Sequence, residues 1–160
     1  MAEARIFEDL KHDHDQHRKL LAQIADSDGD DAERRSLFEK LRKELQAHAA
    51  AEEESLYATM LGCPDLRDDA RHSVAEHKEI DDKLGELCAA DPASRDWTET
   101  FGELRHRYLH HIDEEDEEMF PRAAEGLTAE AEERIAKVFE RRKPRELQRA
   151  EQELPGDERE

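Results

Sequence analysis

The chain has 160 residues and a mass of 18.6 kDa, the size of one domain, and only 36% of its residues are hydrophobic. Charged residues make up 43%, with six glycines and five prolines, which is typical of long solvated helices rather than of sheets or low-complexity disorder. The formal net charge of −19 repels phosphate backbones and anionic membranes and attracts cations, so we expect neither nucleic acid nor a membrane as a partner.

The amino end, MAEARIFEDLKHD, has no apolar signal-peptide core. Apolar runs elsewhere fall short of the roughly 18 residues that a membrane span needs. We therefore expect a cytoplasmic protein.

Apolar residues recur at helical spacing in four long stretches, and the breaks between them have turn chemistry. The breaks read DSDGDD, GCPD and DPAS, and Pro121 is expected to close the last stretch. The four expected helices span about residues 3–25, 32–61, 65–90 and 95–120. A shorter fifth helix is expected from the N-cap Thr128 to Arg142.

Short loops between long helices predict an all-α, antiparallel up-down-up-down four-helix bundle. We assign residues 1–125 to this bundle, 126–143 to the accessory fifth helix and 144–160 to a charged, disordered tail. The fifth helix has one apolar side, which either caps the bundle or forms the contact of a homodimer. The sequence favours neither alternative.

An internal repeat relates the two halves of the bundle. Shifting the sequence by 63 residues places apolar positions on apolar positions and ionisable positions on ionisable ones. The ionisable pairs are His14 with His77, His48 with His111, and Glu52 with Glu115. The first two helices therefore resemble an earlier copy of the next two, related by an approximate two-fold axis.

The apolar stripe of each predicted helix is interrupted by polar residues at one level. Counting from the turns at about 1.5 Å of rise per residue places these groups at similar heights in an antiparallel bundle. The six residues at this level are His14, His48, Glu52, His77, His111 and Glu115.

Two carboxylates in an apolar layer need a cation or a proton, since burying an unpartnered carboxylate costs several kcal/mol. Neither stripe offers a facing lysine or arginine. A histidine and a glutamate four residues apart on a helix lie about 5 to 6 Å apart between Cβ atoms, which suits one centre. Four imidazoles and two carboxylates are too many for one tetrahedral zinc ion but suit two bridged iron or manganese ions.

Four motifs resemble the hemerythrin-like, or HHE cation-binding, domain family over about residues 5–122. They read DHDQHRKLL, HAAAEEESLY, EHKEID and HIDEEDEEMFP, beginning at Asp13, His48, Glu76 and His111. The resemblance implies a centre of two non-haem iron ions with an oxo or hydroxo bridge. It also implies that the six residues above are the ligands, with both glutamates bridging.

Two positions depart from the oxygen-carrying hemerythrins. These have a fifth histidine four residues before the equivalent of His77, where this chain has Ser73. Their second carboxylate is an aspartate five residues after its histidine, whereas Glu115 follows His111 by four. Counting ligands then leaves each iron with an open position, which puts simple oxygen carriage in doubt.

Open iron positions favour the binding or turnover of peroxide, dioxygen or nitric oxide. Whether the chain is an enzyme, such as a peroxidase-like, catalase-like or nitric-oxide-handling oxidoreductase, is left open by the sequence. Passive iron or oxygen storage and a metal-dependent regulatory module are the alternatives. Iron rather than manganese or zinc is implied by the resemblance and not by the ligands, because histidine and carboxylate ligands accept all three metals.

The remaining polar residues have simpler interpretations. His17 is expected to be a satisfied core histidine, with a hydrogen-bond donor to a ligand or an extra ligand as the alternatives. Tyr108, one turn from His111, is expected to be a packing residue, with donation of a hydrogen bond or an electron to bound oxygen species as the alternative. The acidic run at residues 113–118 is expected to be a solvated helix face, with iron guidance as the alternative. Four histidines off the stripes are expected at the surface, namely His12, His72, His106 and His110.

Overall fold

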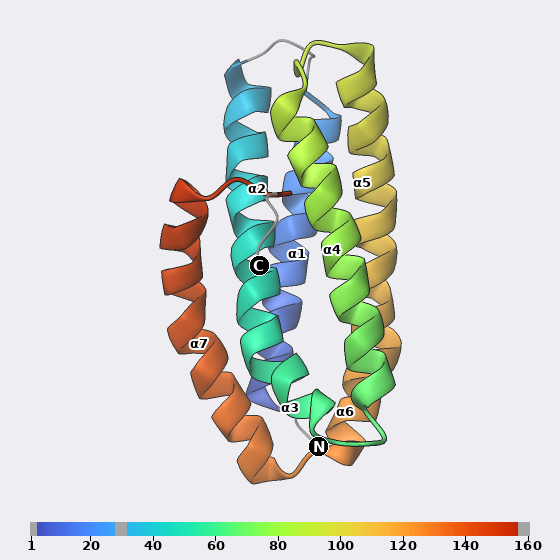
Figure 1. Cartoon of the computed structure of the whole chain (residues 1–160), viewed down its shortest axis with the longest axis vertical. Coiled ribbons are helices and arrows are strands. Elements are labelled where there is room, and N and C mark those ends of the chain that lie inside the picture. The colour runs from blue at the N-terminus through green and yellow to red at the C-terminus, as the bar shows by residue number, and fades with distance from the viewer. Residues whose placement is uncertain (1–2, 28–31, 157–160) are drawn as a thin grey trace.

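The computed structural model describes residues 3–27 and 32–156, which form helices joined by short connections. Four long helices stand side by side, each running opposite to the one before it (Figure 1). They are α1 (Arg5–Ala25), α2 (Ala32–Glu52), α4 (Arg67–Ala89) and α5 (Arg95–Glu114). None of the described helices is both long and apolar enough to cross a membrane.

Each half of the bundle contains one π-helical turn, in which backbone hydrogen bonds reach five residues back. The α2 helix continues through η1 (Glu53–Tyr57) into the short α3 (Ala58–Leu61). The α5 helix continues through η2 (Glu115–Met119) into α6 (Phe120–Gly126). Glu52 therefore ends α2 and Glu115 begins η2, so both glutamates lie where the helical register changes.

The core consists of two apolar clusters at opposite ends of the bundle. One gathers around Phe7, Leu56 and Phe120, near α3 and α6. The other gathers around Ile24 and Trp97, near the connections of α1 to α2 and of α4 to α5. Every residue of the predicted inward stripes is buried, including all six polar residues of the common level. That level lies between the two clusters, where apolar side chains shield it from water at both ends.

The final helix, α7 (Ala129–Gln152), packs along α2 and also contacts α1 (Figure 1). Thr128 caps its first turn, as predicted, by accepting a hydrogen bond from the Ala131 amide at 3.1 Å. Ile135 and Phe139 join the apolar cluster near α3. Within this chain the apolar side of α7 therefore covers the bundle.

The expectation that Pro121 ends the fourth helix is wrong. The chain remains helical to Gly126, with Pro121 in the first turn of α6. Proline has no amide hydrogen and is tolerated in a first turn, where that hydrogen has no partner in the helix. The π-helical turn directly before α6 interrupts the regular hydrogen-bond ladder and places Pro121 in such a turn.

The expected end of the fifth helix at Arg142 is also wrong, and residues 144–152 of the supposed tail are helical. Pro144 lies inside α7, but the side chains beyond it are anchored to the bundle. Glu146 and Ala150 are buried. Arg42 of α2 donates hydrogen bonds to the carbonyl oxygens of Ala150 and Glu153, at 2.9 and 3.3 Å. These contacts offset the backbone hydrogen bond that proline cannot make.

Two smaller expectations concern helix starts. The third long helix begins at Arg67, two residues after its expected start at residue 65, and Leu66 holds its N-cap position. Part of the predicted break DSDGDD before the second helix falls within residues 28–31, which lie outside the described ranges.

Candidate metal centre

The structure brings the six predicted residues together in two groups that share Glu52. One group contains Glu52, His77, His111 and Glu115, and the other contains His14, His48 and Glu52. Within each group the potential ligand atoms all lie within 4.8 Å of one another. Residues from four long helices and η2 thus converge on one buried layer.

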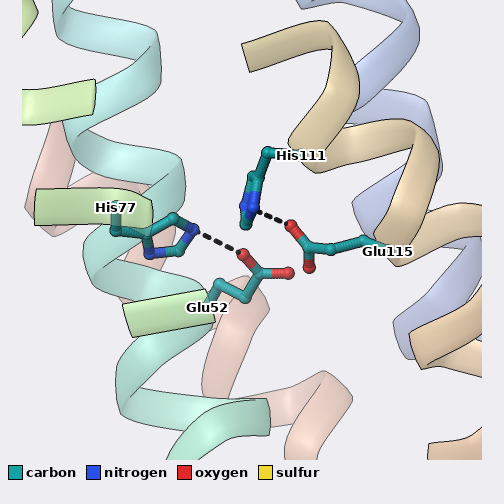
Figure 2. Close-up of side chains that lie close together, drawn as sticks. All are labelled: Glu52, His77, His111 and Glu115. Atoms are coloured by element: carbon teal, nitrogen blue, oxygen red, sulfur yellow. Dashed lines mark ion pairs between the residues drawn. The ribbon is translucent and has the colours of Figure 1, made fainter. Parts of the chain in front are cut away.

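Figure 2 shows the four-residue group, in which each glutamate faces a histidine. Oε1 of Glu52 lies 3.3 Å from Nε2 of His77 and 3.6 Å from Nε2 of His48. Oε1 of Glu115 lies 2.6 Å from Nε2 of His111. Glu52 therefore touches a histidine of each group, which is the position that a bridging carboxylate requires.

In three of the four proposed histidine ligands, the outer ring nitrogen Nδ1 is hydrogen-bonded to a carboxylate. Nδ1 of His14 donates to Asp116 at 2.8 Å, and Nδ1 of His48 donates to Asp13 at 2.8 Å. Nδ1 of His111 donates to Glu76 at 2.9 Å. A carboxylate on the outer nitrogen fixes the tautomer and turns Nε2 inward, which is the usual arrangement of a metal-bound histidine.

His77 is the exception in this pattern. Its Nδ1 lies 3.8 Å from Oε1 of Glu53, which is too far for a hydrogen bond. Shifting Glu53 by 63 residues gives Asp116, the partner of His14. The outer carboxylates therefore follow the same internal repeat as the histidines, although the one beside His77 is too far away for a hydrogen bond.

The polar atoms that point into the layer lack hydrogen-bond partners among the described residues. They are Nε2 of His14, His48 and His111, both carboxylate oxygens of Glu52 and Oε1 of Glu115. Buried polar groups in proteins are nearly always paired, and an orphaned carboxylate is costly. A cation coordinated by these atoms would satisfy all of them, so the residues present fit a metal.

The electrostatics of the layer indicate how it holds charge without a metal. Burial, followed by the charge of Glu115, raises the pKa of Glu52 well above its usual range. Burial alone would raise the pKa of Glu115, but the charge of His111 holds it well below its usual range.

The histidines of the layer also differ in charge. Burial opposes the charging of His111, but Glu115 and Glu76 raise its pKa to about 10. Burial lowers the pKa of His48 to about 3 and keeps that ring neutral. Metal binding would release the protons held on Glu52 and His111.

Two buried hydroxyl groups complete the surroundings of the layer. Tyr57 donates a hydrogen bond to Oε2 of Glu115 at 2.8 Å. Ser73 donates to the sulfur of Met119 at 3.4 Å and belongs to neither ligand group. The place of an additional histidine in oxygen carriers is thus filled by a small side chain with its own partner.

His17 is buried and lies outside both ligand groups. Its Nδ1 lies 2.6 Å from the hydroxyl of Tyr108, and its Nε2 lies 3.9 Å from Glu44. Burial lowers the pKa of His17. Lys143 of α7 pairs with both Glu44 and Asp13, at 3.4 and 2.7 Å. The last helix thus reaches the carboxylate that orients His48.

Sequence reasoning missed the outer carboxylates and Tyr57. Asp13 and Glu76 directly precede His14 and His77 and fall on one another under the 63-residue shift, so the repeat contained a signal for them. Asp116 belongs to the acidic run that was expected to be a solvated face. Its side chain is instead only 16% exposed, and it binds both His14 and Arg18.

A cavity of about 250 Å³ lies beside the layer, between α2 and α4. His48, His77 and Tyr108 line it together with apolar side chains such as Leu45 and Ile80. Since a water molecule occupies about 30 Å³ of liquid, the cavity has room for a small molecule. The cavity therefore reaches two histidines of the layer, His48 and His77.

The chain belongs to the hemerythrin HHE cation binding domain family, because the sequence model of that family matches residues 5–123. It is also similar to the crystal structure of a hemerythrin HHE cation binding domain-containing protein, the Rv2633c homolog from Mycobacterium kansasii. The two share 22% sequence identity with a TM-score of 0.74, over 94% of this chain and 99% of that one. No curated protein matches the chain. The chain is thus an all-α, five-helix, hemerythrin-like domain with buried histidine and glutamate groups able to bind metal.

Proposed function

We propose that the chain is a non-haem di-iron protein that binds and turns over small oxygen or nitrogen species, with hydrogen peroxide as the first substrate to test. The six proposed ligands are His14, His48, Glu52, His77, His111 and Glu115. The observation that carries the proposal is the set of buried Nε2 and carboxylate atoms that face one another in a single layer and have no hydrogen-bond partners among the described residues.

Iron would supply a Lewis acid and a reservoir of electrons at this position. The two groups provide two imidazoles each and share Glu52, whereas Glu115 lies with His77 and His111, so the donors would serve two ions that share Glu52. Imidazole and carboxylate ligands suit iron, and family membership favours iron over other metals that accept the same ligands.

Turnover, rather than carriage alone, is supported by Ser73 and by the cavity. Ser73 adds no imidazole to the layer, which leaves fewer protein ligands than an oxygen carrier has. The cavity beside His48 and His77 gives a small ligand room next to the layer, and both apolar and polar side chains line it. Peroxide, dioxygen and nitric oxide all fit a cavity of this size.

Two tyrosines provide protons near the layer. Tyr57 donates to Oε2 of Glu115 and thereby fixes the orientation of that carboxylate. Tyr108 lines the cavity and shares a short hydrogen bond with Nδ1 of the neutral His17. The Tyr108 hydroxyl can therefore hold a proton against a bound ligand, with His17 as its buried partner.

The proposal is tested by peroxide consumption with the iron-loaded protein, followed with an oxygen electrode and by absorbance. We expect the wild-type protein to consume peroxide and Glu52→Gln to lose both iron and activity. The matched control is Glu118→Gln, which changes an exposed carboxylate in the same acidic run and should behave as the wild type. Activity that survives complete removal of metal would overturn the proposal, whereas a reversible oxygen adduct without consumption would favour passive binding.

A further inference from the structure

Outside the proposed di-iron centre, α4 and α5 carry a second set of histidines and glutamates on their outer surface. His72 and Glu76 are four residues apart on α4, and His110 and Glu114 are four residues apart on α5. These two helices pack against each other (Figure 1). Two histidine–glutamate pairs, each with the spacing of the buried ligand pairs, therefore meet at the surface.

Three residues of this set, His72, Glu76 and Glu114, bring their donor atoms close together, and His110 contacts one of them. Nε2 of His72 lies 3.3 Å from Oε1 of Glu76 and 3.4 Å from Oε1 of Glu114. All three donor atoms lie within 4.8 Å of one another. Nε2 of His110 lies 3.3 Å from the other oxygen of Glu114, so this glutamate joins the two imidazoles.

These separations fit a coordinated cation. Two ligand atoms at about 2.0 to 2.1 Å from a tetrahedral ion lie roughly 3.3 to 3.4 Å from each other, the distances seen around His72. Among the described residues, the ion pairs of Glu76 and Glu114 are all with histidines, so no lysine or arginine competes for these carboxylates. The exposed side of the set leaves room for water as a further ligand.

In the other half of the internal repeat, α7 covers the surface of α1 and α2 that corresponds to this surface of α4 and α5. The counterpart of Glu76 is Asp13, and Lys143 of α7 lies 2.7 Å from it. The counterparts of His110 and Glu114 are Ala47 and Ala51, which are fully buried on α2, the helix that α7 covers. A lysine thus supplies the positive charge beside one outer carboxylate. In the described part of the chain, the ion pairs of the equivalent Glu76 are with the exposed His72 and the buried His111, and none is with a lysine.

The surface set also adjoins the buried layer. Oε1 of Glu76 accepts the hydrogen bond from Nδ1 of His111 and faces His72 with the same oxygen. A small hollow is lined by His72, Glu76 and Glu114 together with His111 and Glu115. A cation in the surface set would therefore share a carboxylate with the orienting contact of a proposed ligand.

We infer that His72, Glu76, His110 and Glu114 form a separate surface site for a divalent transition-metal cation, such as zinc or ferrous iron. Imidazole donors favour these ions over calcium and magnesium. The cation takes the place next to Glu76 that Lys143 holds next to Asp13. This site goes beyond the proposed function and does not depend on it.

The first test counts zinc bound per chain by equilibrium dialysis and elemental analysis, with Zn²⁺ as the probe. We expect the double variant His72→Ala, His110→Ala to bind one zinc ion fewer than the wild type. The control His106→Ala removes another exposed histidine of α5 and should bind as the wild type does. Equal zinc contents in the wild type and the double variant would overturn the inference.

A second test locates the zinc by its protection of histidines from diethylpyrocarbonate, measured residue by residue with mass spectrometry. Zinc should slow the modification of His72 and His110 by about fivefold or more, and leave His106 unchanged. Equal modification of His72 with and without zinc would contradict the site. Repeating both tests in Glu52→Gln separates the two proposals, because the surface zinc should persist when the buried centre is lost.

Discussion

The carboxylate of Asp13 on α1 accepts a hydrogen bond from Nδ1 of His48 on α2 at 2.8 Å. One helix of the bundle therefore orients the proposed ligand of its neighbour. Glu76 of α4 does the same for His111 of α5, and the two pairs are related by the 63-residue repeat. The candidate centre is thus built twice, with the orienting residue as well as the ligand in each copy.

Removing an orienting carboxylate should weaken metal binding without removing a ligand. We expect Asp13→Ala or Asp116→Ala to lower the affinity for iron by about 10- to 100-fold, because the freed imidazole can rotate and change tautomer. Competition with a coloured chelator measures the affinity. Asp15→Ala is the control, since Asp15 is exposed and lies on the same helix as Asp13. Unchanged affinity in both test variants would show that these hydrogen bonds do not support the centre.

Glu52 should favour metal binding at the expense of the stability of the metal-free protein. Its carboxyl group is fully buried and its oxygens lack partners among the described residues. Glu52→Gln removes the ionisable group, so we expect the metal-free variant to have a higher Tm than the metal-free wild type. Ferrous iron should then stabilise the wild type more than the variant, by about 2.7 kcal/mol at 100 times the Kd of the buried centre. Differential scanning fluorimetry without oxygen measures both effects, and equal iron-induced shifts would contradict the role of Glu52.

Asp9 should make the stability of the protein depend on pH. Burial and the neighbouring Glu140 of α7 raise the pKa of Asp9 from 3.8 to about 7. The folded protein therefore keeps a proton that the unfolded chain loses near pH 4, so stability falls between about pH 4 and 7 and then levels off. Asp9→Asn cannot lose a proton, and its Tm should exceed that of the wild type by a few degrees at pH 8 but not at pH 4. Parallel Tm profiles of the two proteins from pH 4 to 8 would refute this.

Replacing a helical glycine by alanine should stabilise the protein at Gly102 but not at Gly85. A Cβ at Gly85 of α4 would lie 3.0 Å from the carbonyl oxygen of Pro155, where the chain after α7 crosses α4. A Cβ at Gly102 of α5 would meet nothing within 4 Å. Gly102→Ala should stabilise the protein by about 0.5 to 1 kcal/mol through helix propensity, whereas Gly85→Ala should not. Urea unfolding measures the free energies, and hydrogen exchange should show faster exchange near Gly156 in Gly85→Ala alone.

The long helices and the level of the buried polar residues could be predicted from the sequence because both depend on helical periodicity. Every predicted stripe residue is buried, since a helix can hide only one face in a bundle. The register of the repeat also placed the six residues at one height. These are local or periodic properties, which a sequence expresses directly.

The end of the last helix could not be predicted in this way. Pro144 is a helix-breaking signal, but Arg42, about a hundred residues earlier, binds the carbonyl oxygens at the far end of α7. Likewise, Asp116 was expected to be solvated because it lies in an acidic run, although it contacts His14 and Arg18 and is largely buried. Both outcomes depend on contacts between distant segments, which outweigh local propensity.

The most direct test of the central claim is the metal content of protein purified without added metal from cells supplied with iron. Elemental analysis and the visible absorption spectrum should be recorded on the same sample. We predict two iron ions per chain besides any cation at the surface site, with charge-transfer absorption that disappears in Glu52→Gln. Zinc in place of iron, or about one metal ion per chain, would contradict a di-iron centre formed by these six residues.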